Sequence, residues 1–265
     1  MHYLRILLVV LLLLAGAPFH PSMKASMTPS MRTSAMTSSE ACTQFDNLIE
    51  QRNVVEAQKV LQGAFQSTPK DYNVLFRMAR LHVLLGDRET SEAKQEALYK
   101  QAVQYGDQAI AINPKGMGGY VYRAAANGKV ALFKGVFSVS DVVAKVRDDA
   151  TKAISLNNEG SQRLAAAEYI LGRTHLALAY KPKLVRLPLG LGWGSIDEAY
   201  AHLKRARSLR PGFIMFELEF ARCLAEMDET AEALKVAKSI SAMKLQEPGD
   251  EKRKDEARQL IQDLE

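Results

Sequence analysis

Three segments of this chain share one pattern of small residues: AQKVLQGAFQSTP at residues 57–69, AVQYGDQAIAINP at residues 102–114 and AYAHLKRARSLRP at residues 199–211. Each has alanine at its first and eighth positions, leucine or glycine at its fifth, and proline at its last. Spacings of three and four residues are typical of one face of an α-helix, and a proline favours the end of that helix. Weaker copies begin at Val146 and Ala233, so the chain is predicted to hold about five related units.

A second helical segment precedes most copies and carries a small residue between larger ones. The examples are Met78-Ala79, Asn127-Gly128, Leu171-Gly172 and Phe220-Ala221. Small residues on both segments allow two helix axes to approach closely, which predicts a helical hairpin in each unit. A single hairpin cannot bury its own apolar face, so stacked hairpins supply the core. The predicted fold is all-α: a right-handed solenoid of about five irregular hairpins, closed by a capping helix near residues 250–264.

The units are irregular because extra residues separate their two helices in the second, third and fourth units. The expected insertions are residues 86–96, 132–142 and 179–195. In the last of these, Ser195 precedes Asp197 and Glu198, which predicts the N-cap and acidic first turn of a helix starting near Ile196.

The small-residue, alanine and proline positions resemble those of the tetratricopeptide repeat. More specific features are Gly128 with Lys134-Gly135, the apolar loop at residues 187–193 and the ending EPGD at residues 247–250. Together they are similar to the regulator-of-microtubule-dynamics branch of tetratricopeptide proteins, which includes exported bacterial relatives. The resemblance covers about residues 41–265. Named members are linked to microtubules and membrane contact sites, but an exported bacterial relative would have no microtubule to regulate.

The first 40 residues differ in composition from the rest. One early positive charge, an apolar run at residues 6–14 and Ala15-Gly16-Ala17 are typical of a secretory signal peptide, predicted at residues 1–17. Residues 18–40 are rich in Ser, Thr, Met and Pro and are predicted to form a disordered tether ahead of the repeat domain at residues 41–265. We therefore expect export to the periplasm or the medium. The alternatives are an uncleaved membrane anchor and an organelle transit peptide.

The net charge of +5 is concentrated in this N-terminal part. Arg5, Lys24 and Arg32 precede the first carboxylate, Glu40. Removing these three from the 35 Lys and Arg residues leaves 32, against 30 Asp and Glu residues. The predicted repeat domain is thus nearly balanced, and a nucleic-acid partner is not expected.

No group of residues has the spacing of a catalytic or metal site. The glycines at residues 190–194 lack the lysine and the preceding strand of a phosphate-binding loop. His82 and His175 occupy equivalent positions in two units but have no second ligand nearby, so we expect packed or hydrogen-bonded imidazoles. His202 is expected at the surface. We expect no cofactor, no metal and no enzymatic activity.

An enzyme with its site in the insertions is the alternative to this view, and the acids available to it are Asp141, Asp148 and Asp149. Cys42 and Cys223 lie in the first and last units, where a solenoid would keep them far apart. Each is predicted to be a small buried residue without a disulfide.

One cation follows the small residue of the first helix in units two to five. These cations are Arg80, Lys129, Arg173 and Arg222, and the apolar residues that flank them include Phe76, Tyr169 and Leu176. In a tetratricopeptide array this position resembles those that point into the concave groove. The pattern predicts a partly basic groove that binds a peptide or protein segment, preferably an acidic one. Local charge pairing, as between Arg222 and Glu219, is the alternative.

A second basic feature lies in the insertion at residues 179–195. Lys181, Lys183 and Arg186 precede the apolar loop that ends at Trp193, and such a loop could contact a partner or an anionic membrane surface. A solvated loop is the alternative. The first functional hypothesis is accordingly a non-enzymatic interaction scaffold. The second is a membrane-contact component that uses the N-terminal segment as its anchor.

Overall fold

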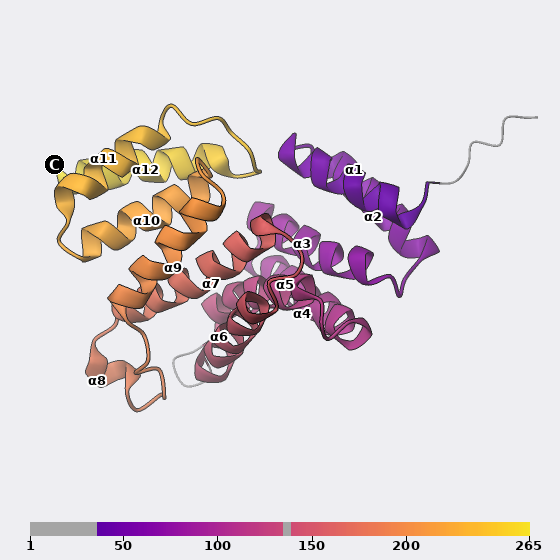
Figure 1. Cartoon of the computed structure of the whole chain (residues 1–265), viewed down its shortest axis with the longest axis horizontal. Coiled ribbons are helices and arrows are strands. Elements are labelled where there is room, and N and C mark those ends of the chain that lie inside the picture. The colour runs from indigo at the N-terminus through magenta and orange to yellow at the C-terminus, as the bar shows by residue number, and fades with distance from the viewer. Residues whose placement is uncertain (1–35, 135–138) are drawn as a thin grey trace, which may run out of the picture. The chain divides into compact units, whose positions relative to one another are not determined.

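Helix-forming residues dominate the chain. The computed structural model describes residues 36–134 and 139–265. These residues form twelve α-helices and one 3-10 helix, with no strand among them (Figure 1). They belong to one compact unit. The predicted signal peptide at residues 1–17, and residues 18–35 of the predicted tether, lie outside the described residues.

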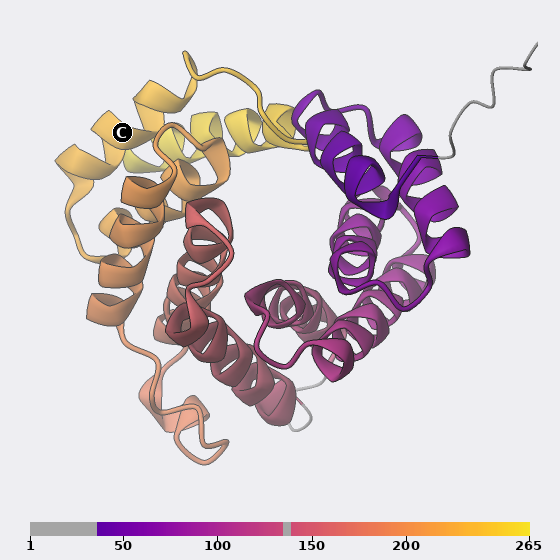
Figure 2. The ribbon, with the colours of Figure 1, turned by 45° about the vertical axis from the view of Figure 1, so that its right-hand side comes forward.

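The helices pair along the chain as five hairpins, and each pair packs on the next (Figure 1, Figure 2). The pairs are α1 (Ser38–Glu50) with α2 (Val54–Ser67), α3 (Tyr72–Arg88) with α4 (Glu92–Ile112), α5 (Met117–Val130) with α6 (Val139–Leu156), α7 (Ser161–Ala179) with α9 (Ile196–Leu209), and α10 (Ile214–Glu226) with α11 (Thr230–Ile240). The predicted all-α solenoid is confirmed.

Three shorter features complete the chain. The 3-10 helix η1 (Ala131–Phe133) follows α5, and the four-residue helix α8 (Lys183–Arg186) lies between α7 and α9. The last helix, α12 (Asp250–Leu264), packs on α10 and α11 as the predicted closing helix. Its Leu260, Ile261 and Leu264 contact the largest apolar cluster. Among the described residues, no helix is both long enough and apolar enough to span a bilayer.

The small residues of the repeat pattern lie where helices touch. Ala102 and Ala199 are fully buried. At Gly172 on α7, a Cβ atom would lie 2.9 Å from Leu203 Cγ and 3.0 Å from Leu203 N on α9. These distances are shorter than ordinary carbon contacts, so only glycine allows the two helices to approach this closely. Pro114 follows the end of α4 by two residues, as expected of a helix stop.

Two boundaries differ from the sequence-based expectation. The first helix begins at Ser38, inside the predicted tether, because Thr37 and Glu40 form a capping box that satisfies backbone N–H groups at the helix start. The first expected insertion, residues 86–96, is mostly helical: α3 runs to Arg88 and α4 begins at Glu92. The extra residues therefore lengthen two helices and leave a short loop. Of the second insertion, residues 135–138 are not described.

Candidate functional site

A cavity of about 690 Å³ opens among the helices, and we call it the main cavity. Helices α3, α5 and α7 contribute about half of its wall, and the rest comes from α6, α8, α10 and the segments around them, with single residues from α1 and α12. A second cavity of about 140 Å³, the side cavity, adjoins it. Both cavities are lined by Tyr169, Arg173, Met215 and Arg253, which makes the two a continuous region.

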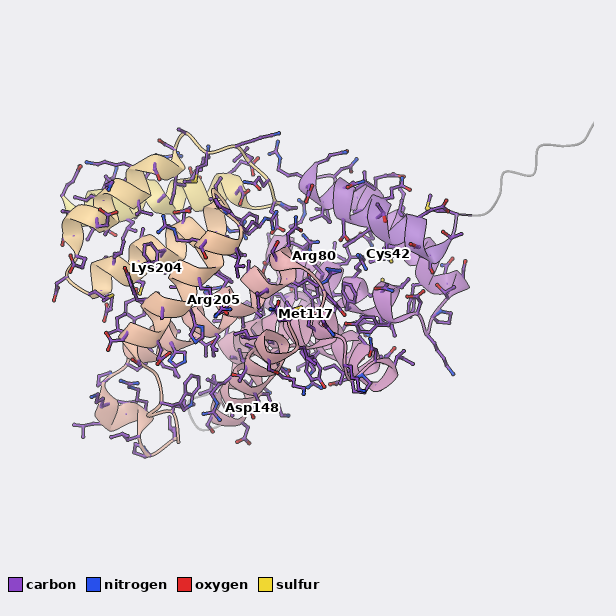
Figure 3. The ribbon with its side chains drawn as sticks, viewed as in Figure 1. Cys42, Arg80, Met117, Asp148, Lys204 and Arg205 are labelled. Atoms are coloured by element: carbon purple, nitrogen blue, oxygen red, sulfur yellow. The ribbon has the colours of Figure 1, made fainter. Side chains whose placement is uncertain are left out.

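The structure brings most of the predicted site residues to this region. Arg80, Lys129 and Arg173 line the main cavity together, and Arg222 lines the side cavity. Phe76 and Tyr169 also line the main cavity although both are more than nine-tenths buried. Arg80 projects from α3 and is labelled in Figure 3.

Leu176 does not lie at either cavity, contrary to the expectation. It is 1% exposed and belongs to the apolar cluster that α7 forms with α9 and α10. An apolar residue at helical spacing can serve either a groove or the core of its own hairpin. Burial of Leu176 between α7 and α9 removes more apolar surface from water than a position at the cavity wall would, so Leu176 packs in the core.

The main cavity is much richer in cations than the repeat position alone predicts. Nine cations line it in total: Arg80, Lys129, Lys134, Arg163, Arg173, Lys181, Arg186, Arg210 and Arg253. Six of these lie outside the repeat position. Lys181 and Arg186 belong to the predicted second basic feature, and Lys134 was marked only by the family resemblance. The other three, Arg163, Arg210 and Arg253, were missed because no repeat pattern marks them.

The balance of charge and polarity in the main cavity is distinctive. Only two carboxylates, those of Asp46 and Glu247, line it beside the nine cations. Most other lining residues are apolar, so the wall of the cavity combines cationic side chains with apolar ones.

Each of the four predicted cations also has a carboxylate nearby. Arg80 Nη2 is 2.8 Å from Glu247 Oε1, and Arg80 Nη1 is 3.2 Å from Asp46 Oδ1. Lys129 Nζ donates to Asp87 Oδ1 at 2.5 Å. Burial lowers the pKa of Lys129, although the nearby Asp87 carboxylate opposes this shift.

The pairing of the other two cations differs in strength. Arg222 Nη1 donates to Glu219 Oε1 at 2.7 Å, and its Nη2 donates to Glu256 Oε2 at 2.9 Å. Arg173 Nε is 3.7 Å from Glu219 Oε1, and the Arg173 side chain is 48% exposed. Local pairing therefore accounts for Arg222, whereas Arg173 has the loosest pairing of the four and the most access to solvent.

The histidines have structural partners. His82 Nδ1 lies 2.8 Å from the Met78 carbonyl oxygen. His175 is buried, and its Nδ1 accepts a hydrogen bond from the Ser195 backbone N–H at 3.3 Å. Burial lowers the pKa of His175 to about 4, and the neighbouring His202 acts in the same direction. Packed or hydrogen-bonded imidazoles were expected at both positions.

His202 was expected at the surface, and it is partly exposed. Its side chain is 23% exposed, and its Nδ1 lies 2.6 Å from Oε2 of Glu168, a carboxylate that is 1% exposed. A buried carboxylate requires partners, and α9 supplies them through His202 and Arg205 (Figure 3 labels Arg205). Glu168 has no counterpart in the repeat pattern, which is why the sequence did not predict this pairing.

The structure also shows the surroundings of the two cysteines and of the predicted residues in the loop before α9. Cys42 and Cys223 are buried free thiols, as predicted. No group of three or more potential metal ligands occurs in the described part of the chain.

Ser195 caps α9, as predicted, by accepting a hydrogen bond from the Glu198 backbone N–H. Trp193 packs edge-on against His175, with ring centroids 5.0 Å apart, whereas Arg186 lines the main cavity.

Paired helices with small residues at their contacts, stacked into an all-α solenoid, define a protein of the tetratricopeptide-repeat class. A family profile described as Regulator of microtubule dynamics protein 1-3 matches residues 41–265. The chain therefore belongs to the regulator of microtubule dynamics 1-3 family. A comparison with curated protein sequences found no significant match.

Solved structures of repeat proteins are similar to this chain. TTC0263, a thermophilic TPR protein of Thermus thermophilus, has a TM-score of 0.60 and 19% identity over 85% of this chain and 100% of its own. MamA from Desulfovibrio magneticus RS-1 has a TM-score of 0.44 and 14% identity over 76% of this chain and 92% of its own. YrrB, described as a TPR protein with an unusual peptide-binding site, has a TM-score of 0.39 and 16% identity over 77% of this chain and 88% of its own. The likeness to TTC0263 supports the fold.

Proposed function

We propose that this protein is a non-catalytic interaction scaffold whose main cavity binds a protein segment that carries both apolar and acidic side chains. The observation that carries this proposal is the lining of one cavity of about 690 Å³ by nine cations and two carboxylates among mainly apolar residues. The repeat class and the family fit a scaffold fold, because rigid stacked helices present a preformed surface and reduce the ordering cost on binding.

The electrostatic part of the proposal depends on Arg173 more than on Arg80. Arg80 is occupied by Asp46 and Glu247, whereas Arg173 is half-exposed and its nearest carboxylate oxygen is 3.7 Å away. A carboxylate on the bound segment can form a closer, charge-assisted hydrogen bond with Arg173 than Glu219 does. The partner is thus expected to gain more from a carboxylate placed beside Arg173 than from one beside Arg80.

Binding to an array of short synthetic peptides with graded acidic and apolar content tests the proposal. Wild-type protein is expected to prefer peptides that combine both features, and Arg173→Glu should weaken their binding about tenfold. The matched control is Lys204→Glu, since Lys204 is exposed on α9 and lines neither cavity (Figure 3). Equal binding of acidic and basic peptides to the wild-type protein would contradict the proposal.

An exposed apolar segment favours membrane association as a second candidate function. In and beside α8, Leu184 is 86% exposed and Leu187 is 57% exposed, and the cations Lys181 and Lys183 are close in sequence. Apolar side chains beside cations suit the surface of an anionic bilayer. Flotation with vesicles containing phosphatidylserine would detect this association, and Leu184→Glu with Leu187→Glu should abolish it. Flotation that is unchanged in this double variant would contradict the role of α8.

We also propose that the chain is exported, on the strength of the charged start, apolar run and small residues within residues 1–17. An uncleaved leader that anchors the protein is the alternative. Cell fractionation combined with N-terminal sequencing of the product separates these two outcomes. A full-length protein in the cytoplasm would contradict both.

A further inference from the structure

Arg186, the last residue of α8, is a buried guanidinium at the wall of the main cavity. It is 6% exposed and lines that cavity. Its Nη1 donates to the Gly194 carbonyl oxygen at 2.5 Å. Its Nε is fully buried and has no hydrogen-bond acceptor in the described residues.

This arginine lacks the counterion that a buried guanidinium normally has. Arg77, which is 8% exposed, donates from Nε and Nη2 to Asp46 Oδ2 at 3.0 and 2.6 Å. Within the described part of the chain, no carboxylate oxygen lies within 4.0 Å of the Arg186 nitrogens, and residues 1–35 and 135–138 contain no Asp or Glu. A buried charge without a partner is unfavourable, so the binding of an anion beside Arg186 would lower the free energy of the protein.

One nitrogen of Arg186 remains to donate to an incoming carboxylate. Nη1 is engaged by Gly194 and Nε is covered by protein atoms, so Nη2 is the group that can form a charge-assisted hydrogen bond with that carboxylate. The backbone of Arg186 is fixed, because its carbonyl accepts hydrogen bonds from the N–H groups of Leu189 and Leu191 at 3.2 and 3.0 Å. Gly194 contributes as well, since a Cβ atom there would lie 2.8 Å from Arg186 Nη1.

We propose that Arg186 is the specificity-determining residue of the main cavity and receives a carboxylate that the bound segment carries among apolar residues. The inference rests on the proposed function and names the feature of the partner that this part of the cavity selects. Leu178, Leu189 and Leu191 line the same cavity and would contact the apolar neighbours of that carboxylate. Their low polarity strengthens the charge-assisted hydrogen bonds.

A peptide fits the lining better than a lipid does. The cations come from α3, α5, α7, α8 and α12 and from the loops that follow η1, α7 and α9, and the polar side chains Gln162 and Thr174 lie among them. A single anionic headgroup would use only one of these positions, whereas a peptide presents polar groups at regular intervals along its length. The occupant we assign is therefore a peptide segment.

Two labelled probes test the assignment on the full chain. The first is a fluorescein-labelled, amidated pentapeptide, Leu-Leu-Glu-Leu-Leu, and the second has glutamine in place of glutamate. Fluorescence anisotropy of the wild-type protein should show at least about tenfold tighter binding of the glutamate peptide. Arg186→Gln should abolish this preference. The control Lys183→Gln, an exposed residue of the same helix that lines neither cavity, should keep it.

The possible results separate this inference from the proposed function. Equal binding of both peptides to the wild-type protein, or a preference retained in Arg186→Gln, overturns the role of Arg186 alone. Failure of both peptides to bind contradicts the proposed function together with the inference. If sodium dodecanoate binds through Arg186 while neither peptide binds, the occupant is an anionic lipid and the peptide assignment is wrong.

A stability measurement tests whether the Arg186 side chain has a purely structural role. Arg186→Met keeps the apolar stem and removes the uncompensated charge, so the unfolding temperature of the ligand-free protein should be unchanged or higher. A fall of several degrees would mean that the guanidinium is needed to hold the loop, and it would overturn the assignment as a ligand receptor.

Discussion

Arg80 and Glu247 are 167 positions apart in the chain, and their Nη2 and Oε1 atoms are 2.8 Å apart. The pair joins α3, in the second hairpin, to the segment that precedes α12. Asp46 of α1 and Arg210, just after α9, extend it into a network. Part of the main cavity wall is therefore built from residues at both ends of the repeat array.

Breaking this network should destabilise the protein. In Glu247→Gln, Arg80 and Arg210 lose a carboxylate that is 8% exposed, and we expect the free energy of unfolding to fall by ~2 kcal/mol. Urea denaturation measures this change. The control is Glu251→Gln, which removes an exposed ion pair with Arg52 and should cost less than ~0.5 kcal/mol. Equal losses of stability in both variants would mean that the network stabilises the protein no more than an exposed ion pair does.

Two glycines at the same repeat position should respond in opposite directions to alanine. Gly172→Ala places a Cβ 2.9 Å from Leu203 Cγ and should cost ~1–3 kcal/mol. Gly128→Ala adds a methyl group with nothing within 4 Å and should stabilise α5 by ~0.5–1 kcal/mol. Thermal unfolding of the two variants checks this pair. A loss of stability in Gly128→Ala would show that the helix has no room there.

The buried imidazole of His175 should make stability fall in mild acid. Its pKa is lowered by burial to about 4, whereas an unfolded histidine titrates near about 6.5. Since the unfolded chain binds the proton more readily, the contribution of His175 is complete above about pH 6.5 and is lost as the pH falls toward 4. His175→Asn should lose ~1–2 kcal/mol less than the wild type between pH 7 and about pH 5, measured by urea denaturation. Identical pH profiles would contradict the pKa shift.

The two thiols should be unreactive in the folded protein. Burial raises the pKa of Cys42, and it raises the pKa of Cys223 to about 12, so little thiolate is present near pH 8. An aromatic disulfide reagent should label neither cysteine in native protein and both in guanidinium chloride. Rapid labelling of Cys223 in the native state would show that α10 opens locally.

Local sequence signals predicted the helices and their pairing well. The spacing of Ala199, Leu203 and Ala206 marked the buried face of α9, and Ser195 marked its start. The start of α1 was also within reach, because Thr37 and Glu40 have the spacing of a capping box, but the composition of the preceding segment hid it. Caps and helix faces depend on neighbours a few residues away, and this is why a single sequence reveals them.

The site was less accessible to such reasoning. The repeat position identified Arg80, Lys129 and Arg173 at the main cavity, yet Leu176, at the helical spacing of a groove residue, lies in the core. The six further cations of the cavity come from loops and helix ends that carry no periodic signal. These cations meet at one cavity because of how successive hairpins are stacked. A local sequence pattern does not predict that stacking.

The stack of helical hairpins and the close packing of its small residues follow from the amino-acid sequence alone, since helix periodicity and helix stops act over a few residues. The contact of Arg80 with Glu247 and the burial of Arg186 without a counterion among the described residues follow from how the hairpins stack. Ion pairing and burial depend on groups that are distant along the chain, and stacking brings these groups together from different hairpins.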